Sequence, residues 1–590
     1  MHTRAVCAVA WVLLLALGAW AQANPNPVTG VAYQVRIEGL DAAGLDATAR
    51  GIAETVTRRD ERPRSLTHLR RRAERDRARL LELLRGEAYY AAEVEVRIER
   101  DAEPVRVLLL AAPGPRYRLG AVTFTARPAG TPAPDWPAPE AVGLGAGNFA
   151  TAGALLDATG QLLTHLRANG YPFPEERNRR VVVDHAVPEV RAEYLIAPGP
   201  RAGYGPLRIE GLETVRPEVI EKRVPWKPGE TYEDSALGRF TATLYETQLF
   251  AIARVEPIDA VEDGRVPIRV AVKEADHRTL ALGLTFETER GAGAEVRWEH
   301  RNMRGRGERL RLEADWLQDA IGFEARYLVP LVNQPGETIE GVLGTRDEDT
   351  EAFDVTEVQA GLHYTRPLRA RLKLRVGVRA SAGQVEQFDE TDGFGLAAMP
   401  LTLDYDARDD AVNPTRGFRL RGTIEPFFGS STFVRAEATG SHYLRLGGPR
   451  LVLATQLRVG STWLTDDVFD VPAHERYYAG GGGSLRGYPF QEAGVLVGNA
   501  PLGGRSLIEA AVELRRQVTD SIGVVAFVDG GTTYRNAYPD FKEDLLFGAG
   551  LGLRYNTPIG PLRFDVAVPL NKRAGIDSNF EVYVAFGQTF

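Results

Sequence analysis

The chain ends in the stretch EVYVAFGQTF, residues 581–590, in which two kinds of side chain alternate. One parity carries the large apolar residues Val582, Val584, Phe586 and Phe590, and the other carries Ala585, Gly587 and Thr589. Successive side chains of a strand point to opposite faces, so a lipid-exposed strand needs apolar residues on one parity and tolerates small or polar residues on the other. The stretch therefore predicts the last strand of a membrane β-barrel.

The same period of two begins near residue 280 and continues to the end of the chain. In the segments 310–316, 372–379 and 562–568, apolar residues interleave with Arg, Lys, Glu and Asp. A soluble sandwich would give this alternation in a single strand, but here the strands run to about 10 residues, longer than the ~5–6 of globular sheets. Since lipid offers backbone groups no hydrogen-bond partner, a spanning sheet must close on itself. We count sixteen strands and predict a sixteen-stranded antiparallel transmembrane β-barrel over residues 277–590.

Length and composition suit a chain of several domains outside the cytoplasm. The 590 residues exceed a single hydrophobic core, and the net charge of −8 gives no electrostatic case for nucleic acid. His2 and Arg4, the apolar stretch 5–20 and the small residues before Asn24 predict a secretory signal over residues 1–23. The single cysteine, Cys7, lies inside that signal, so we expect no disulfide or thiolate chemistry in the mature protein.

The front half of the sequence repeats itself. The motif RIEGL occurs at 36–40 and again at 208–212, an offset of 172 (208 − 36), and APGPR occurs at 112–116 and 197–201, an offset of 85 (197 − 112). The larger offset is close to twice the smaller, which indicates an array of three similar small domains. We place them at residues 24–115, 116–201 and 202–276.

Each repeat predicts a strand, then helices, then two strands. The first has a strand over 33–40, a helix over 65–84 and strands near 92–99 and 105–110; the third has helices over 217–224 and 235–249. In the second, a proline-rich loop at 128–139 leads into a helix that carries Leu155, Leu162 and Leu166. This βααββ order, with PGETY at 228–232, resembles the polypeptide-transport-associated (POTRA) domains.

The longest expected connection, residues 466–505, contains AGGGGS at 479–484 and then the motif Leu485, Arg486, Gly487 and Tyr488. One interpretation is a flexible external loop. The other is a loop folded into the barrel, because LRGY is similar to the Val/Ile-Arg-Gly-Phe/Tyr motif of the BamA-like outer-membrane assembly and transport superfamily. The resemblance implies that Arg486 meets acidic groups on inner strand faces, with Glu513 in VELR and Asp529 in FVDGG as partners.

A guanidinium among carboxylates gains charge-assisted bonds that fix an otherwise mobile loop. We expect a hydrated lumen to screen this interaction, lowering the cost of removing one partner from the ~3–5 kcal/mol of a buried pair toward the ~1 kcal/mol of an exposed one. The sequence therefore predicts that Arg486→Ala weakens function more than folding.

Three POTRA-like units before a sixteen-stranded barrel resemble the TamA family, the outer-membrane subunits of the translocation and assembly module. The resemblance implies insertion or secretion of outer-membrane clients, autotransporters especially, in contact with outer-membrane lipid. It also implies a TamB-like inner-membrane-anchored partner that binds the POTRA domains in the periplasm. A short seam between the first strand (Leu280, Leu282, Leu284) and the last (Val582 to Phe590) would template an incoming client strand by β-augmentation.

Other functions receive less support from the residues. A two-partner secretion transporter, exporting one dedicated exoprotein through its pore, is the main alternative. The histidines lack metal-ligand spacing, and Gly548, Gly550 and Gly552 alternate as in a strand, so we expect no catalysis, metal or cofactor. The arginine cluster at 70–79 is interpreted as a solvated helix face, with anionic lipid as the alternative. The segments 302–308 and 409–417 are similar to family motifs or are simply tight turns.

Overall fold

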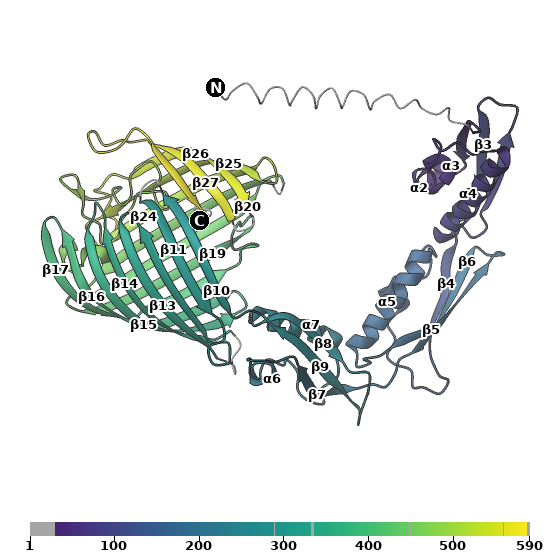
Figure 1. The fold of residues 1–590 in the computed structure, drawn as a ribbon, viewed down its shortest axis with the longest axis horizontal. Helices are drawn as coiled ribbons and strands as arrows, with labels where there is room; N and C mark the ends of the chain where they lie inside the picture. The colour runs from purple at the N-terminus through teal and green to yellow at the C-terminus, as the bar shows by residue number, and fades with distance from the viewer. Residues whose placement is uncertain (1–29, 288–289, 332–335, 449, 558–559, 587–589) are drawn as a thin grey trace, which may run out of the picture. The chain divides into compact units, whose positions relative to one another are not determined.

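The computed structural model describes residues 30–590 except 288–289, 332–335, 449, 558–559 and 587–589 (Figure 1). The predicted signal segment 1–23, with Cys7, lies outside the described residues. The chain divides into two compact units. The first holds most of the front domains, and the second holds part of the third domain together with residues 269–590.

The first small domain contains the three-stranded sheet β1-β3-β2, built from β1 (Tyr33–Glu38), β2 (Glu93–Glu99) and β3 (Val105–Ala112). The central strand β3 pairs parallel with β1 and antiparallel with β2. The helices are α2 (Asp46–Ile52), α3 (Glu54–Thr57) and α4 (Leu66–Gly86). Helix α4 begins where the Ser65 side chain accepts the His68 N–H, and it buries Leu69, Ala73, Leu80 and Leu84 at helical spacing.

The arginine-rich face of α4 is solvent-exposed and carries several ion pairs. Arg75 pairs with Glu54 at 3.0 Å, and Arg77 pairs with Glu74 at 2.9 Å. Arg70 and Arg71 are exposed. The arrangement fits the predicted solvated face, and binding to anionic lipid stays a prediction.

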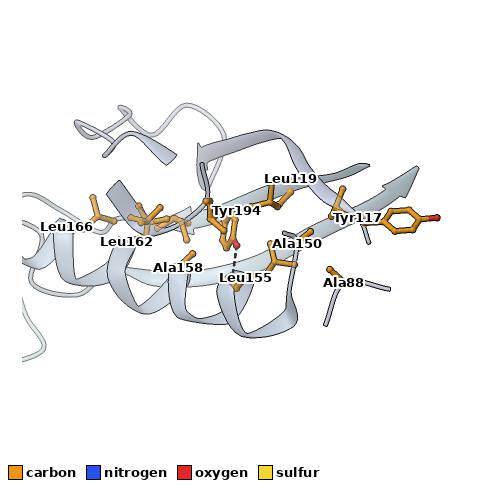
Figure 2. Packing of buried hydrophobic residues seen from close by; sticks show 14 residues of the cluster. Ala88, Tyr117, Leu119, Ala150, Leu155, Ala158, Leu162, Leu166 and Tyr194 are labelled. Atoms are coloured by element: carbon orange, nitrogen blue, oxygen red, sulfur yellow. Dashed lines mark hydrogen bonds between the residues drawn. The ribbon is translucent and has the colours of Figure 1, made fainter. Parts of the chain in front are cut away.

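The second domain departs from the predicted order because only one α-helix forms between its strands. A 3₁₀ turn, η2 (Pro139–Val142), precedes α5 (Ala152–Ala168) in the sheet β4-β6-β5, which consists of β4 (Arg118–Ala126), β5 (Glu175–Asp184) and β6 (Glu189–Ala197). The prolines of the preceding loop lack the N–H groups that a helix needs. Figure 2 shows the core, in which Leu155, Leu162 and Leu166 of α5 belong to one cluster with Tyr194, whose hydroxyl donates to the Leu155 carbonyl at 2.9 Å.

The third domain has the predicted order of elements. Its sheet β7-β9-β8 is built from β7 (Gly203–Glu210), β8 (Phe250–Pro257) and β9 (Arg265–Glu274), with helices α6 (Glu218–Glu221) and α7 (Asp234–Glu246). The first helix is a single turn, shorter than the predicted 217–224. None of the helices in the described part of the chain is long and apolar enough to span a membrane.

The rest of the chain forms one large antiparallel sheet, whose strands lie side by side in chain order (Figure 1). Its strands are β10 (Arg278–Glu287), β11 (Gly291–His300), β12 (Arg309–Leu317), β13 (Ala320–Pro330), β14 (Thr338–Asp349), β15 (Asp354–Arg369), β16 (Leu372–Gln387), β17 (Glu390–Ala398), β18 (Leu401–Asp406), β19 (Gly417–Gly429), β20 (Phe433–Arg445), β21 (Leu451–Trp463), β24 (Ser506–Gln517), β25 (Ile522–Tyr534), β26 (Leu546–Thr557), β27 (Gly560–Pro569) and β28 (Glu581–Phe586).

These seventeen strands occupy sixteen positions, because β17 and β18 are two halves of one strand. Both pair with β16 on one side and β19 on the other, in a common register. Pro400 separates them, since proline has no N–H to donate to the ladder. The position count therefore equals the sixteen strands predicted.

Closure of the sheet into a barrel stays a prediction. The ladders of the described residues leave β10 and β28 as the two ends of the sheet. These two strands contact each other.

The outer face of the sheet is apolar and the inner face is charged. Leu280, Leu282 and Leu284 of β10 are 65%, 75% and 93% exposed, and Leu562, Phe564, Val566 and Val568 of β27 are also exposed. Arg563 and Asp565, which alternate with these residues along β27, are buried on the inner face. This is the distribution expected of a sheet whose outside meets lipid.

Candidate functional site

The connection between β21 and β24, residues 464–505, folds against the inner face of the sheet. It contains η3 (Val468–Asp470), η4 (Ala473–Glu475), β22 (Leu496–Val497) and β23 (Ala500–Pro501). Tyr477, Leu485 and Tyr488 form a buried cluster with Leu507 of β24 and Leu546 of β26. The interpretation as a flexible external loop is therefore wrong, and the segment is called the inserted loop below.

Arg486 is the centre of the contacts between the inserted loop and the strands. Its Nε and Nη2 donate to the two oxygens of Asp529 at 2.6 and 2.8 Å, and its Nη1 donates to Glu513 at 2.6 Å. The guanidinium carbon also lies 3.4 Å from the centroid of the Phe527 ring. The two carboxylates named from the sequence thus both contact Arg486, one of them in a bidentate pair.

A third carboxylate completes this site. Asp565 of β27 lies 3.4 Å from Arg486 Nη1, and it also pairs with Arg554 of β26. Arg515 donates to Glu513 at 2.7 Å. Asp565 was not predicted as a partner of Arg486, although the apolar residues on either side of it place its side chain on the inner face.

The site is dry, which corrects the expectation of a hydrated and screened pair. Arg486, Glu513 and Asp565 are 0% exposed and Asp529 is 1% exposed. Removing one partner of such a buried pair leaves an uncompensated charge, at a cost of about 3–5 kcal/mol. The smaller cost of an exposed pair does not apply here.

Glycines make the close approach of the inserted loop to β26 possible. A Cβ atom on Gly548 would lie 1.8 Å from the carbonyl oxygen of Arg486, and one on Gly550 would lie 2.4 Å from Phe527 Cζ. Gly487 has a φ of +101°, in the left-handed region that favours glycine. Gly548 therefore provides the space into which the loop backbone fits, and Gly550 leaves room for the Phe527 ring on which Arg486 packs. The sequence did not predict this role.

Hydrogen bonds also tie the inserted loop to the last strand. The Tyr583 hydroxyl of β28 accepts from the Gly487 N–H at 2.8 Å and donates to the Tyr488 carbonyl at 3.1 Å. The Tyr488 hydroxyl lies 3.1 Å from the Phe547 carbonyl. Tyr583 was not predicted, because it lies on the opposite parity from the apolar residues of this strand.

A second anchor holds the beginning of the inserted loop. Glu475 is 4% exposed and accepts from Arg379 Nη2 at 3.0 Å and from Arg435 Nη1 at 3.2 Å. These arginines come from β16 and β20. The inserted loop is thus held at two places. Arg486 of the loop binds carboxylates of the strands, and Glu475 of the loop binds arginines of the strands.

The predicted seam residues lie on the two strands at the ends of the sheet order, β10 and β28. Leu280, Leu282 and Leu284 lie on the outer face of β10, and Val582 and Val584 are half-buried on β28. The side chain of Phe586 lies outside the described residues.

Phe590 does not continue the outward-facing row. It packs against Tyr443, Val452 and Ala454, which are buried on the inner face, and the Arg515 guanidinium lies 5.1 Å from its ring centroid. The prediction that Phe590 shares the lipid-facing side of the last strand is therefore wrong. Phe590 instead contacts the Tyr443 ring and the Arg515 guanidinium, and these contacts favour the inward position.

The turn 301–308 between β11 and β12 docks on residues of the third domain. The Arg216 N–H donates to the Gly305 carbonyl at 2.8 Å, and Asn302 Nδ2 donates to Thr214 Oγ1 at 3.2 Å. A Cβ on Gly305 would lie 2.9 Å from the Thr214 carbonyl oxygen. The segment is a tight turn, and it is also a junction between the third domain and the large sheet.

Glu274 organises this junction. Burial by itself raises the pKa of Glu274, but hydrogen bonds from Thr214 Oγ1, from the Val215 and Glu213 N–H groups and from His277 outweigh burial and lower the pKa to about 2. The ionised carboxylate is therefore the stable form at neutral pH.

We predict that acid loosens this junction. Because the folded pKa of Glu274 lies below the ordinary value of 4.5, its ionised form stabilises the junction above about pH 4.5, and this contribution is lost as the pH falls toward 2. Hydrogen exchange of the 211–218 peptide, corrected for intrinsic pH effects, should accelerate over that range. In Glu274→Gln, exchange should be fast already at pH 7 and show no such transition; an unchanged transition would contradict the assignment.

Comparisons with known proteins support the arrangement. Residues 302–590 match the Omp85 superfamily domain. The outer membrane protein assembly factor BamA of Nitratidesulfovibrio vulgaris is 23% identical over 543 residues, covering 88% of this chain and 68% of that protein. The chloroplastic outer envelope protein 80 of Arabidopsis thaliana is 22% identical over 397 residues, covering 60% of this chain and 52% of that protein.

A solved structure has the same fold. The crystal structure of BamA from Haemophilus ducreyi lacking POTRA domains 1–3 superposes with a TM-score of 0.69 at 17% identity, covering 80% of this chain and 100% of the other. The chain spans about half to two thirds of the length of the two curated relatives.

Proposed function

We propose, from the Omp85 superfamily domain that this chain carries over residues 302–590, that the protein is an outer-membrane assembly factor that inserts or secretes β-barrel clients. Its fold is of the Omp85 type, with three small POTRA-like sheets before the large antiparallel sheet. The client strand would be accepted where β10 and β28 meet. The process needs no bond chemistry and no cofactor, since burial of the client's apolar surface in lipid supplies the free energy.

The observation that carries this proposal is the position of β10 and β28 at the two ends of the large sheet. These two end strands contact each other. Strand edges of this kind pair readily with an added strand. Tyr583 meanwhile ties β28 to the inserted loop, which supports a fixed position for one side of the seam.

The finer assignment is to the TamA type. Three POTRA-like units support it, and they would face the periplasm while the large sheet spans the outer membrane in contact with its lipid. A TamB-like inner-membrane-anchored protein is the proposed partner of the POTRA-like units, and unfolded outer-membrane proteins, autotransporters above all, are the proposed clients. Capture of that partner by the full-length chain, and loss of capture when the first POTRA-like unit is deleted, tests this assignment.

Cross-linking the seam tests the function itself. Leu282→Cys with Val584→Cys, treated with a short reducible bis-maleimide, should abolish accelerated client insertion into liposomes, because the client strand can no longer enter. Reduction of the cross-linker should restore the activity.

The control is a cross-link between strands that already pair. Glu313→Cys and Glu324→Cys occupy facing positions in the β12–β13 ladder, so their linkage should leave insertion unchanged. Unimpaired insertion with a closed seam would contradict the proposal. Export of a single exoprotein through the closed-seam protein would favour a two-partner secretion transporter instead.

A further inference from the structure

A cavity of about 530 Å³ lies between the inserted loop and the inner face of the large sheet. Its lining includes five arginines and a histidine, namely Arg290, Arg346, Arg458, Arg476, Arg563 and His474. Among the residues that the structure describes, no aspartate or glutamate contributes to the lining. The volume falls within the range of small-molecule sites.

Four of these arginines already face carboxylates. Arg290 pairs with Asp319 and Glu348, Arg346 pairs with Glu348, Arg458 pairs with Glu437 and Glu509, and Arg563 lies 3.7 Å from Asp565. Their positive charges are thus partly neutralised by carboxylates that are not among the lining residues.

Arg476 is different because its hydrogen bonds end on neutral acceptors. Its Nε donates to the Val471 carbonyl at 2.7 Å, and its Nη1 donates to Gln387 Oε1 at 2.7 Å and to the Leu502 carbonyl at 3.0 Å. The residue is 7% exposed, and no carboxylate within the described ranges lies within 4.0 Å of it. A buried guanidinium whose hydrogen bonds all end on neutral acceptors has lost its hydration without gaining a close ion pair, so a bound anion would stabilise it.

Two further features of the lining suit an anion. Both ring nitrogens of His474 are buried with no hydrogen-bond partner among the residues described, and the ring lies 4.3 Å from that of Phe394. Gly483 borders the cavity, and a Cβ atom there would meet nothing within 4 Å. The lining therefore offers polar groups and open space at the same place.

We propose that this cavity binds a small phosphate-bearing ligand, with Arg476 as the cation whose charge the ligand neutralises. Planar guanidinium forks match phosphate oxygens in bidentate geometry, and several of them around one space favour a multivalent oxyanion over a single carboxylate. A second cavity that Arg476 also lines contains Glu390, Asp392 and Asp470 and would repel the same ligand. The ligand is therefore expected on the arginine-lined side alone.

The test uses the purified full-length chain in lipid nanodiscs, titrated calorimetrically with pyrophosphate and with glycerol 3-phosphate. The decisive variant is Gly483→Asp, which adds a carboxylate to the cavity where there is space for it. The φ of Gly483 is not in the left-handed region, so the substitution adds no backbone strain. Gly483→Asn has the same size without the charge and is the matched control.

We expect pyrophosphate to bind the wild type and Gly483→Asn similarly, and Gly483→Asp at least about tenfold more weakly, because like charges repel strongly at short range. If nanodiscs containing phosphatidylglycerol compete with pyrophosphate, the natural ligand is a lipid headgroup; if they do not, it is a soluble phosphate. Absence of binding to the wild type, or equal binding to Gly483→Asp and Gly483→Asn, would overturn the proposal.

Discussion

Arg486→Ala is expected to lower the free energy of unfolding by about 3–5 kcal/mol, because it leaves Glu513, Asp529 and Asp565 buried together without their common cation. The three carboxylates are at most 1% exposed, so water cannot replace the guanidinium. The sequence by itself had predicted the opposite, namely that Arg486→Ala weakens function more than folding. Client insertion should be lost as a consequence of the displaced loop.

Denaturant titration of the protein folded into lipid vesicles measures this effect, with heat-modifiable gel mobility as a second readout. The matched control is Arg375→Ala, which removes a 2.8 Å pair with Glu340 whose arginine is 40% exposed. That pair should contribute no more than about 1 kcal/mol. Equal losses of unfolding free energy in the two variants would show that solvent screens the ion pairs of Arg486.

Gly548→Val is expected to expel the inserted loop from the sheet. The new Cβ would lie 1.8 Å from the Arg486 carbonyl oxygen, and a backbone atom cannot rotate away as a side chain can. The loop then loses the contacts of Arg486, so the stability loss should reach the same range of about 3–5 kcal/mol. The strands themselves should still form, because their ladders do not depend on the loop.

Limited trypsin digestion measures this expulsion. The wild-type loop should resist cleavage after Arg486, whereas Gly548→Val should be cut there while the sheet remains intact. Gly422→Val is the control, since Gly422 also lies in a strand, β19, and its Cβ would meet nothing within 4 Å. Resistance of the Gly548→Val loop to trypsin would contradict the close approach.

Local patterns in the sequence were sufficient to predict the secondary structure of the large sheet. The alternation in 562–568 fixes which side chains face outward, and the same rule holds for Leu280, Leu282 and Leu284 of β10. Repeated motifs likewise predicted three small domains. In the second domain the sequence correctly placed a helix after the proline-rich loop, but the βααββ order implied another helix before it, where the structure has only a 3₁₀ turn.

The Arg486 site was predicted only in part, since motif resemblance supplied Arg486, Glu513 and Asp529 but not Asp565, Tyr583 or Gly548. These three come from strands distant in sequence, and only strand register places them beside the loop.

By itself, the sequence determined the strand faces, the three repeats and the motif of the inserted loop, because each follows from side-chain spacing along the backbone. Only the tertiary structure decided that the loop site is dry, that Phe590 turns inward to Tyr443 and Arg515, and that an arginine-lined cavity remains beneath the loop. Burial and charge pairing depend on which strands lie opposite one another, and that is a property of the folded sheet.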